Sequence, residues 1–136
     1  MGNSPYYTAI KANDAYYYLD NAHGNTRMYR VPSAEHEDPI RVPLSASVAH
    51  GLAAHEPAAY KLVNYDADWL YLKGDNNLSL FRIRKDGTEY QESVAGNKDR
   101  REFLDIVDGW VFYVGADGIL YKEAFTGTGE PEPMSK

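Results

Sequence analysis

The chain has 136 residues, enough for one domain with a core of its own, and it contains 43% hydrophobic and 25% charged residues, as globular proteins do. Its net charge of −6 argues against a nonspecific nucleic-acid binder. The absence of Cys excludes disulfides, thiolate metal sites and thiol nucleophiles, and no apolar run approaches the roughly 20 residues of a membrane span.

In chain order, three stretches of similar sequence follow one another, which is the pattern of a repeat protein. Each contains an aromatic strand, a turn rich in Gly, Asn or Asp, and an apolar–aromatic–basic triplet. The aromatic strands are expected at Ala15–Leu19, Asp68–Leu72 and Gly109–Tyr113, and the triplets at Met28–Arg30, Leu80–Arg82 and Leu120–Lys122. The spacing of these landmarks aligns Tyr16 with Trp69 and Trp110.

A first and a fourth strand complete each repeat. First strands are expected at 7–10, 60–63 and 101–104, and fourth strands at 39–42, 89–92 and 130–134. Each repeat is therefore predicted to be a four-stranded antiparallel meander within a single β-repeat domain. The repeats cover about 5–44, 58–96 and 99–134.

An insertion at about 45–57 lengthens the connection between the first and second repeats. Its Ala content allows a short helical turn that starts at Ser45 or Ser47, with Gly51 and Pro57 limiting its length. Because insertions confined to one repeat often line a binding face, we expect this segment to protrude and to contact a partner or a second copy. The binding residues predicted here are His50, His55 and Glu56.

Two repeats carry a pattern known from a protein family. Trp69–Leu72 with Leu80–Thr88, and Asp108–Tyr113 with Leu120–Lys122, resemble the repeats of a bacterial tyrosine-rich β-propeller family of unknown function, related to the propellers of low-density-lipoprotein-receptor-type proteins. The first repeat departs from the pattern, with Tyr16 in place of Trp. The resemblance implies three propeller blades and carries no catalytic residues.

Three blades leave two open flanks, because propellers use about four to eight blades. We expect two copies to form a six-bladed ring as a homodimer, with the first repeat of each packed against the third repeat of the other. The alternative is that the chain is part of a longer parent protein whose other blades cover the open flanks. A β-trefoil, which also has three four-stranded repeats, is the alternative fold.

The large aromatic residues are interpreted as packing residues between repeats, since such rings bury much area. They are Tyr16, Tyr29, Trp69, Tyr71, Phe81, Trp110, Phe112 and Tyr121. The four His show no metal-ligand spacing, and no nucleotide-binding or nucleophile motif occurs, so we expect no catalytic residue, metal or cofactor.

The expected function is a non-catalytic binding or scaffolding module that uses its loops to bind a protein or carbohydrate partner, without nucleic acid or membrane insertion. The alternatives are a hydrolase or lyase on the same scaffold, and a trefoil lectin-like sugar binder. An enzyme should gather titratable side chains from different repeats near the axis, whereas a binding module should show an aromatic or acidic rim. No signal peptide is recognised, and we expect a soluble protein, with an extracellular or cell-envelope location within a longer parent as the alternative.

Overall fold

The computed structural model describes residues 7–20, 26–32, 38–54, 60–74, 80–93, 100–127 and 129–134. These residues form an all-β fold of three four-stranded antiparallel sheets with one short helix, as the repeats predicted. The first sheet consists of β1 (Tyr7–Lys11), β2 (Tyr16–Asp20), β3 (Arg27–Val31) and β4 (Ile40–Val42). The second consists of β5 (Tyr60–Tyr65), β6 (Trp69–Gly74), β7 (Leu80–Arg84) and β8 (Tyr90–Glu92). The third consists of β9 (Arg100–Val107), β10 (Trp110–Gly115), β11 (Leu120–Ala124) and β12 (Glu132–Pro133).

Each sheet is a meander, because every strand pairs with its neighbour in sequence. The β9–β10 hairpin shows how a tight link is made: Val107 pairs with Trp110, and the two residues between them, Asp108 and Gly109, have φ of 54° and 81°. A two-residue turn of this kind requires positive φ at both positions, which Asp and Gly tolerate best. The Asp-Gly pair was therefore a correct turn signal.

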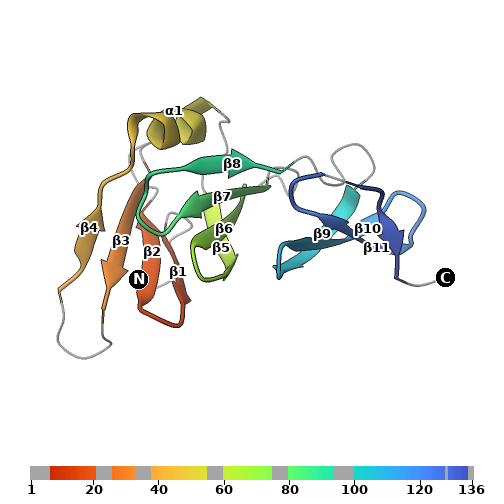
Figure 1. Cartoon of the computed structure of the whole chain (residues 1–136), viewed down its shortest axis with the longest axis horizontal. Helices are drawn as coiled ribbons and strands as arrows, with labels where there is room; N and C mark the ends of the chain where they lie inside the picture. Colours follow the sequence, from red (N-terminus) through yellow and green to blue (C-terminus); the bar gives the residue numbers. More distant parts are fainter. Residues whose placement is uncertain are drawn as a thin grey trace.

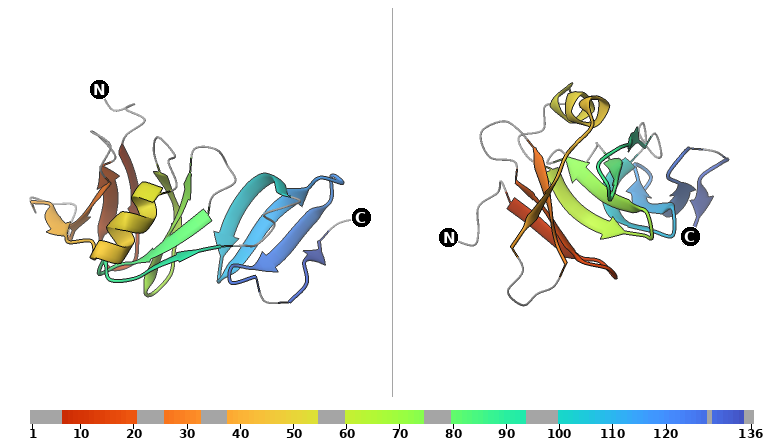
Figure 2. Two further views of the ribbon diagram at one scale, coloured as in Figure 1. Left: turned by 90° about the horizontal axis from the view of Figure 1, so that it is seen from above. Right: turned by 60° about the vertical axis from the view of Figure 1, so that its left-hand side comes forward.

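The three sheets follow one another along the long axis of the molecule, with the first and third sheets at opposite ends (Figures 1 and 2). Their first strands lie closest to one another, since β1 packs against β5 and β5 against β9. Leu62 N–H donates to the Thr8 hydroxyl at 3.2 Å, and Asn64 Nδ2 donates to the Ile106 carbonyl oxygen. This arrangement is compatible with propeller blades that have their first strands innermost.

Two clusters of buried side chains fill the two contacts between sheets. The cluster between the first and second sheets is the larger and includes Tyr17, Leu19, Met28, Leu70 and Phe81. The cluster between the second and third sheets has these buried members: Tyr71, Leu80, Ile106, Val111, Tyr113 and Phe125. The second sheet is therefore covered on both faces. This explains why its central strand β6 has consecutive buried residues at Leu70, Tyr71 and Leu72 rather than strict alternation.

The helix α1 (Ala46–Ala54) lies in the insertion beside β8 (Figure 1). Ser45 is its N-cap, because the Ser45 hydroxyl accepts the Val48 N–H at 3.3 Å. Contrary to expectation, the helix packs on the sheets instead of protruding from them. Val48 and Leu52 are buried in the larger cluster, and the Tyr60 hydroxyl donates to the Leu52 carbonyl oxygen at 2.5 Å. α1 also continues through Gly51, one of the two residues expected to limit its length, because this packing outweighs the helix-breaking tendency of one Gly. Among the described residues, no helix is long and apolar enough to cross a membrane.

The structure corrects the alignment of the first repeat by one residue. The Ala12 N–H donates to the Ala15 carbonyl at 2.9 Å, as the Asp66 N–H does to the Trp69 carbonyl at 3.0 Å. Ala15, rather than Tyr16, therefore stands at the position of Trp69.

Cross-strand pairing gives the same alignment for the central strands. The residue paired with the basic member of the triplet is Tyr17 in the first sheet, Tyr71 in the second and Phe112 in the third. A one-residue shift moves each side chain of a strand to the other face. Tyr16 and Tyr18 consequently lie on the face of the first sheet that points away from the second sheet.

Candidate binding surfaces

Each sheet has two chemically different faces. We call the face that points to the next sheet along the chain the forward face, and the opposite one the backward face. In both contacts between sheets, the forward face of one sheet packs on the backward face of the next. The forward faces contribute Ala15, Tyr17 and Met28 from the first sheet and Trp69, Tyr71 and Leu80 from the second. The backward faces contribute Leu70, Leu72, Phe81 and Ile83 from the second sheet and Val111, Tyr113 and Tyr121 from the third.

An arginine connects the second sheet to the third. The Arg82 guanidinium carbon lies 4.1 Å from the centre of the Trp69 ring and 5.0 Å from that of Phe125, in the turn that follows β11 of the third sheet. Its Nη1 donates to the Tyr71 hydroxyl at 3.4 Å, and Tyr71 packs edge-on against Phe125 with ring centres 5.5 Å apart. Burial and the hydrogen bond from its hydroxyl to Asp66 raise the pKa of Tyr71 to about 12.

The equivalent position in the first contact is also polar and aromatic. The Tyr17 hydroxyl donates to Asp14 Oδ2 at 2.8 Å, and Lys85 Nζ of the second sheet pairs with Asp14 Oδ1 at 3.0 Å. Burial and the Asp14 hydrogen bond raise the pKa of Tyr17 to about 12. Burial also raises the pKa of Asp14, but the hydrogen bonds from Tyr17 and Lys85 outweigh it, so that this pKa lies below its usual value. The Asp14–Lys85 ion pair therefore joins the first sheet to the turn that follows β7.

Two faces remain without a sheet against them in the part of the chain that the structure describes. One is the backward face of the first sheet, which presents Tyr16, Tyr18, Tyr29 and Val31; the Tyr18 and Tyr29 rings stack with centres 4.8 Å apart. The other is the forward face of the third sheet, which presents Trp110, Phe112, Val114, Leu120 and Lys122. We call them the first end face and the third end face.

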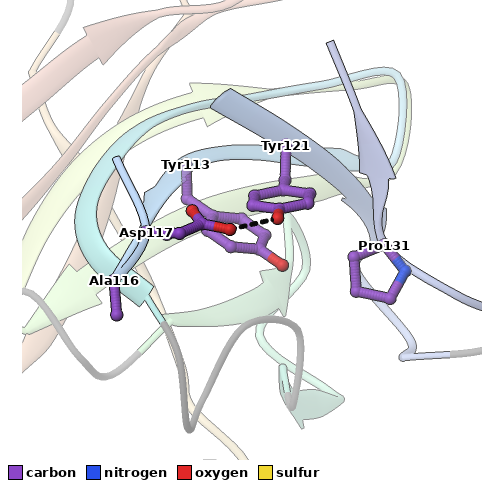
Figure 3. A pocket seen from close by; sticks show the side chains of 6 residues that line it. Tyr113, Ala116, Asp117, Tyr121 and Pro131 are labelled. Carbon is purple, nitrogen blue, oxygen red and sulfur yellow. Dashed lines mark hydrogen bonds between the residues drawn. The ribbon is translucent and has the colours of Figure 1, made fainter. Parts of the chain in front are cut away.

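A cavity of about 330 Å³ opens at the β10–β11 turn. It is lined by Tyr113, Gly115, Ala116, Asp117, Tyr121 and Pro131, and we call it the Tyr121 cavity (Figure 3). The Tyr113 and Tyr121 rings stack with centres 5.7 Å apart, and Pro131 lies across the opening from the Asp117 side (Figure 3). The chain here offers an aromatic ring, a proline ring and a carboxylate around one opening.

The Asp117 carboxylate in this cavity is oriented by its neighbours. Its Oδ1 accepts the Ile119 N–H at 2.9 Å, and its Oδ2 accepts the Tyr121 hydroxyl at 2.5 Å. Gly115 makes the approach possible, because a Cβ there would lie 2.9 Å from Tyr121 Cε2 and 3.0 Å from Asp117 Oδ1.

A second hollow, of about 360 Å³, lies between the first strands of the second and third sheets. Its titratable lining residues come from two sheets: Lys61 and Lys73, which pair across β5 and β6, and Asp105 from β9. Asp105 Oδ1 accepts the Ile106 N–H at 2.8 Å and Asn64 Nδ2 at 3.4 Å. The carboxylate therefore joins the two sheets, and the hollow combines two ammonium groups with a structural Asp.

The predicted packing aromatics divide into two groups. Tyr71 and Phe81 are buried and Trp69 and Tyr121 partly buried within the sheet contacts, whereas Tyr16, Tyr29, Trp110 and Phe112 lie on the two end faces. Lys122 Nζ lies 4.5 Å from the centre of the Trp110 ring, as Arg82 covers Trp69. Both tryptophans are half-buried beneath a cation, Trp69 beside the third sheet and Trp110 on the third end face.

The predicted binding residues are not brought together in the described structure. His50 belongs to α1, but its side chain is outside the described part, and His55 and Glu56 lie outside the described residues altogether. Among the described residues, no group of three or more His, Asp or Glu lies close enough to hold a metal ion.

Sequence reasoning missed the Tyr121 cavity. The sequence predicts only a Gly- and Asp-rich hairpin turn at residues 115–118, and Gly118, with φ of 83°, does adopt a turn conformation. The available signal was that Gly115 and Asp117 precede an aromatic residue in the following strand.

Comparison with models of protein families finds none that matches this chain, and comparison with curated proteins finds no match either.

Proposed function

We propose that the chain is a non-catalytic binding module with blades of β-propeller type, and that it binds a neutral carbohydrate in the Tyr121 cavity. The observation that carries this proposal is the oriented Asp117 carboxylate beside the Tyr121 ring in a cavity of about 330 Å³. Binding cavities for small molecules measure about 300–1,000 Å³ and combine apolar walls with a few convergent polar groups.

The chemistry of the lining favours a sugar. Carbohydrates present apolar C–H faces that pack on aromatic rings, together with hydroxyls that donate to a carboxylate. Tyr121 and Pro131 supply the apolar surfaces, and Asp117 supplies the acceptor. The carboxylate and the net charge of −6 disfavour an acidic sugar. The titratable groups with shifted pKa values described above belong to the contacts between sheets, which supports binding rather than acid–base catalysis.

Titration of the ¹⁵N-labelled protein with the methyl glycosides of glucose, galactose and N-acetylglucosamine tests this proposal. We expect saturable shifts of the amide signals of residues 115–119, with a dissociation constant of order 1 mM for a monosaccharide in so open a site. Absence of saturable shifts with all three glycosides would overturn the proposal. New sugar signals on prolonged incubation would show hydrolysis and favour an enzyme instead.

Three variants make the test specific. Asp117→Asn keeps the acceptor for the Ile119 N–H but removes the negative charge, and Gly115→Ala pushes on Tyr121 and Asp117; both should lose binding. Asp108→Asn is the matched control, because Asp108 is an exposed turn residue at the opposite end of β10 where positive φ tolerates Asn. Asp108→Asn should bind as the unaltered chain does.

A further inference from the structure

The first end face is the counterpart of a face that the chain buries. Tyr16, Tyr18, Tyr29 and Val31 stand at the positions of Leu70, Leu72, Phe81 and Ile83 in the second sheet. The four residues of the second sheet are 0% exposed because the first sheet covers them, whereas the four of the first sheet are only partly buried. The geometry of this face is therefore that of a surface onto which another sheet fits.

The third end face is the counterpart of the other buried face. Phe112 and Leu120 stand at the positions of Tyr71 and Leu80, which are 2% and 0% exposed beneath the third sheet. Trp110 and Lys122 repeat the pair of Trp69 and Arg82, whose cation reaches a ring of the next sheet. Leu104 and Val107 of β9, at 47% and 42% exposure, add apolar surface on the third sheet.

The two end faces differ in charge in a complementary way. Pairing across the strands places Lys11, Arg27 and Arg41 with the tyrosines on the first end face, alongside Asp20. It places Glu102 and Glu132 on the third end face, alongside Lys122, which covers Trp110. The first end face is thus net basic and the third net acidic, which favours contact of one with the other over contact of like with like.

The residue types also fit a surface that is exposed to water in the free chain and covered in an assembly. Where the buried backward face of the second sheet has Leu70, Leu72 and Phe81, the first end face has three tyrosines. Tyrosine has a large apolar ring and a polar tip, so it is tolerated in water and is enriched at protein interfaces.

We propose that the occupant of these faces is a second copy of the chain, joined head to tail, with the third end face of each copy on the first end face of the other. The contact would repeat the packing that the chain makes twice internally, forward face on backward face. Two such contacts close a two-fold ring of six sheets, within the range of about four to eight blades that propellers use. This inference rests on the equivalence of the faces and is independent of the Tyr121 cavity.

A charge-exchange experiment tests the assembly. Light scattering at micromolar concentration should give twice the chain mass of 15.3 kDa. Tyr18→Glu introduces a negative charge opposite the acidic third end face of the other copy, and Phe112→Arg introduces a positive charge opposite its basic first end face. Each substitution alone should therefore weaken association at least about 30-fold, the effect of one interface hot spot. Mixing the two variants places Glu opposite Arg in one contact and leaves the other unaltered, so a heterodimer should form.

The matched control is Ala67→Arg, a charge change in an exposed turn away from both end faces, which should remain dimeric. Circular dichroism verifies that each variant is folded. The chain has two Trp residues, so Trp69→Phe leaves Trp110 as the single tryptophan fluorophore. Its fluorescence emission should shift to the blue as protein concentration rises and the third end face is covered. A wild-type monomer at all concentrations, open polymers, or dimers of either charge variant alone would overturn the proposal.

Discussion

Arg82 lies in β7 of the second sheet and Phe125 directly follows β11 of the third, yet the guanidinium carbon of Arg82 lies 5.0 Å from the centre of the Phe125 ring. The same cation lies over Trp69 and donates to Tyr71 and, at 2.6 Å, to Gln91. A planar cation with several donors suits this position, because it can stack on rings and form hydrogen bonds at once. One side chain therefore links the second sheet to the third.

Replacing Arg82 by Met should weaken the contact between these sheets while keeping the apolar stem. We expect the free energy of unfolding to fall by about 2 kcal/mol, from the lost cation–π contacts and the hydrogen bonds of the guanidinium. Urea denaturation followed by circular dichroism measures it.

Arg84→Met is the matched control. Arg84 also lies over Trp69, at 4.9 Å, but its side chain is 36% exposed and pairs with Glu89 on the surface. Its removal should cost less than about 1 kcal/mol. Equal losses for the two variants would mean that the bridge to Phe125 contributes nothing.

Strand positions were accessible from the sequence, whereas the register of the first sheet was not. In the second and third repeats a single Trp at the start of the strand fixes the alignment, but the first repeat has Tyr16, Tyr17 and Tyr18 in succession. Three identical residues satisfy either register, and the residue that matches Trp69 is the inconspicuous Ala15. Only cross-strand pairing and the turn hydrogen bond separate the two alignments.

The role of the insertion was also hidden from the sequence. The hydrophobic residues Val48 and Leu52 are four apart, but Gly51 between them argued against a continuing helix. Burial of both side chains against the first two sheets, together with the Ser45 cap, compensates for the Gly. The Tyr121 cavity could not be predicted from the sequence for a different reason. The residues that form the β10–β11 turn also line the cavity, and the turn alone accounts for their residue types.

Removing the buried face of α1 should destabilise the whole protein. Leu52 is 4% exposed within the larger cluster, and Leu52→Ala should lower the free energy of unfolding by about 2–4 kcal/mol through lost apolar contacts and a cavity. Ala49→Ser, on the exposed side of the same helix, should change it by less than about 0.5 kcal/mol. If Leu52→Ala were as stable as Ala49→Ser, the insertion would be peripheral after all.

Stability should decline in alkaline solution because of two tyrosines. The pKa of Tyr17 and of Tyr71 is about 12 in the folded protein, against 10.0 for the free side chain. Between these pH values the unfolded chain has lost the proton and the folded chain has kept it, so stability is full below pH 10 and decreases as pH rises toward 12.

The variant Tyr17→Phe, Tyr71→Phe tests this pH dependence. Its free energy of unfolding should be lower than that of the unaltered protein at pH 8, because two hydrogen bonds to Asp14 and Asp66 are gone. Between pH 10 and 12 it should fall less steeply. Urea titrations across this range measure both quantities, and parallel curves for the two proteins would contradict the assignment.

The two Trp residues should respond differently to the same substitution, because they occupy equivalent positions but only Trp69 packs against a cluster of buried side chains in the described structure. Trp69 packs against the core between the second and third sheets, and Trp69→Ala should cost about 3 kcal/mol. Trp110 lies on the third end face beneath Lys122, so in the monomeric Phe112→Arg background Trp110→Ala should cost about 1 kcal/mol, mainly the cation–π contact. In the unaltered chain, Trp110→Ala should also weaken association, which light scattering measures. If Trp110→Ala cost as much as Trp69→Ala in the monomer, the chain itself would cover the third end face, and no second copy would be needed there.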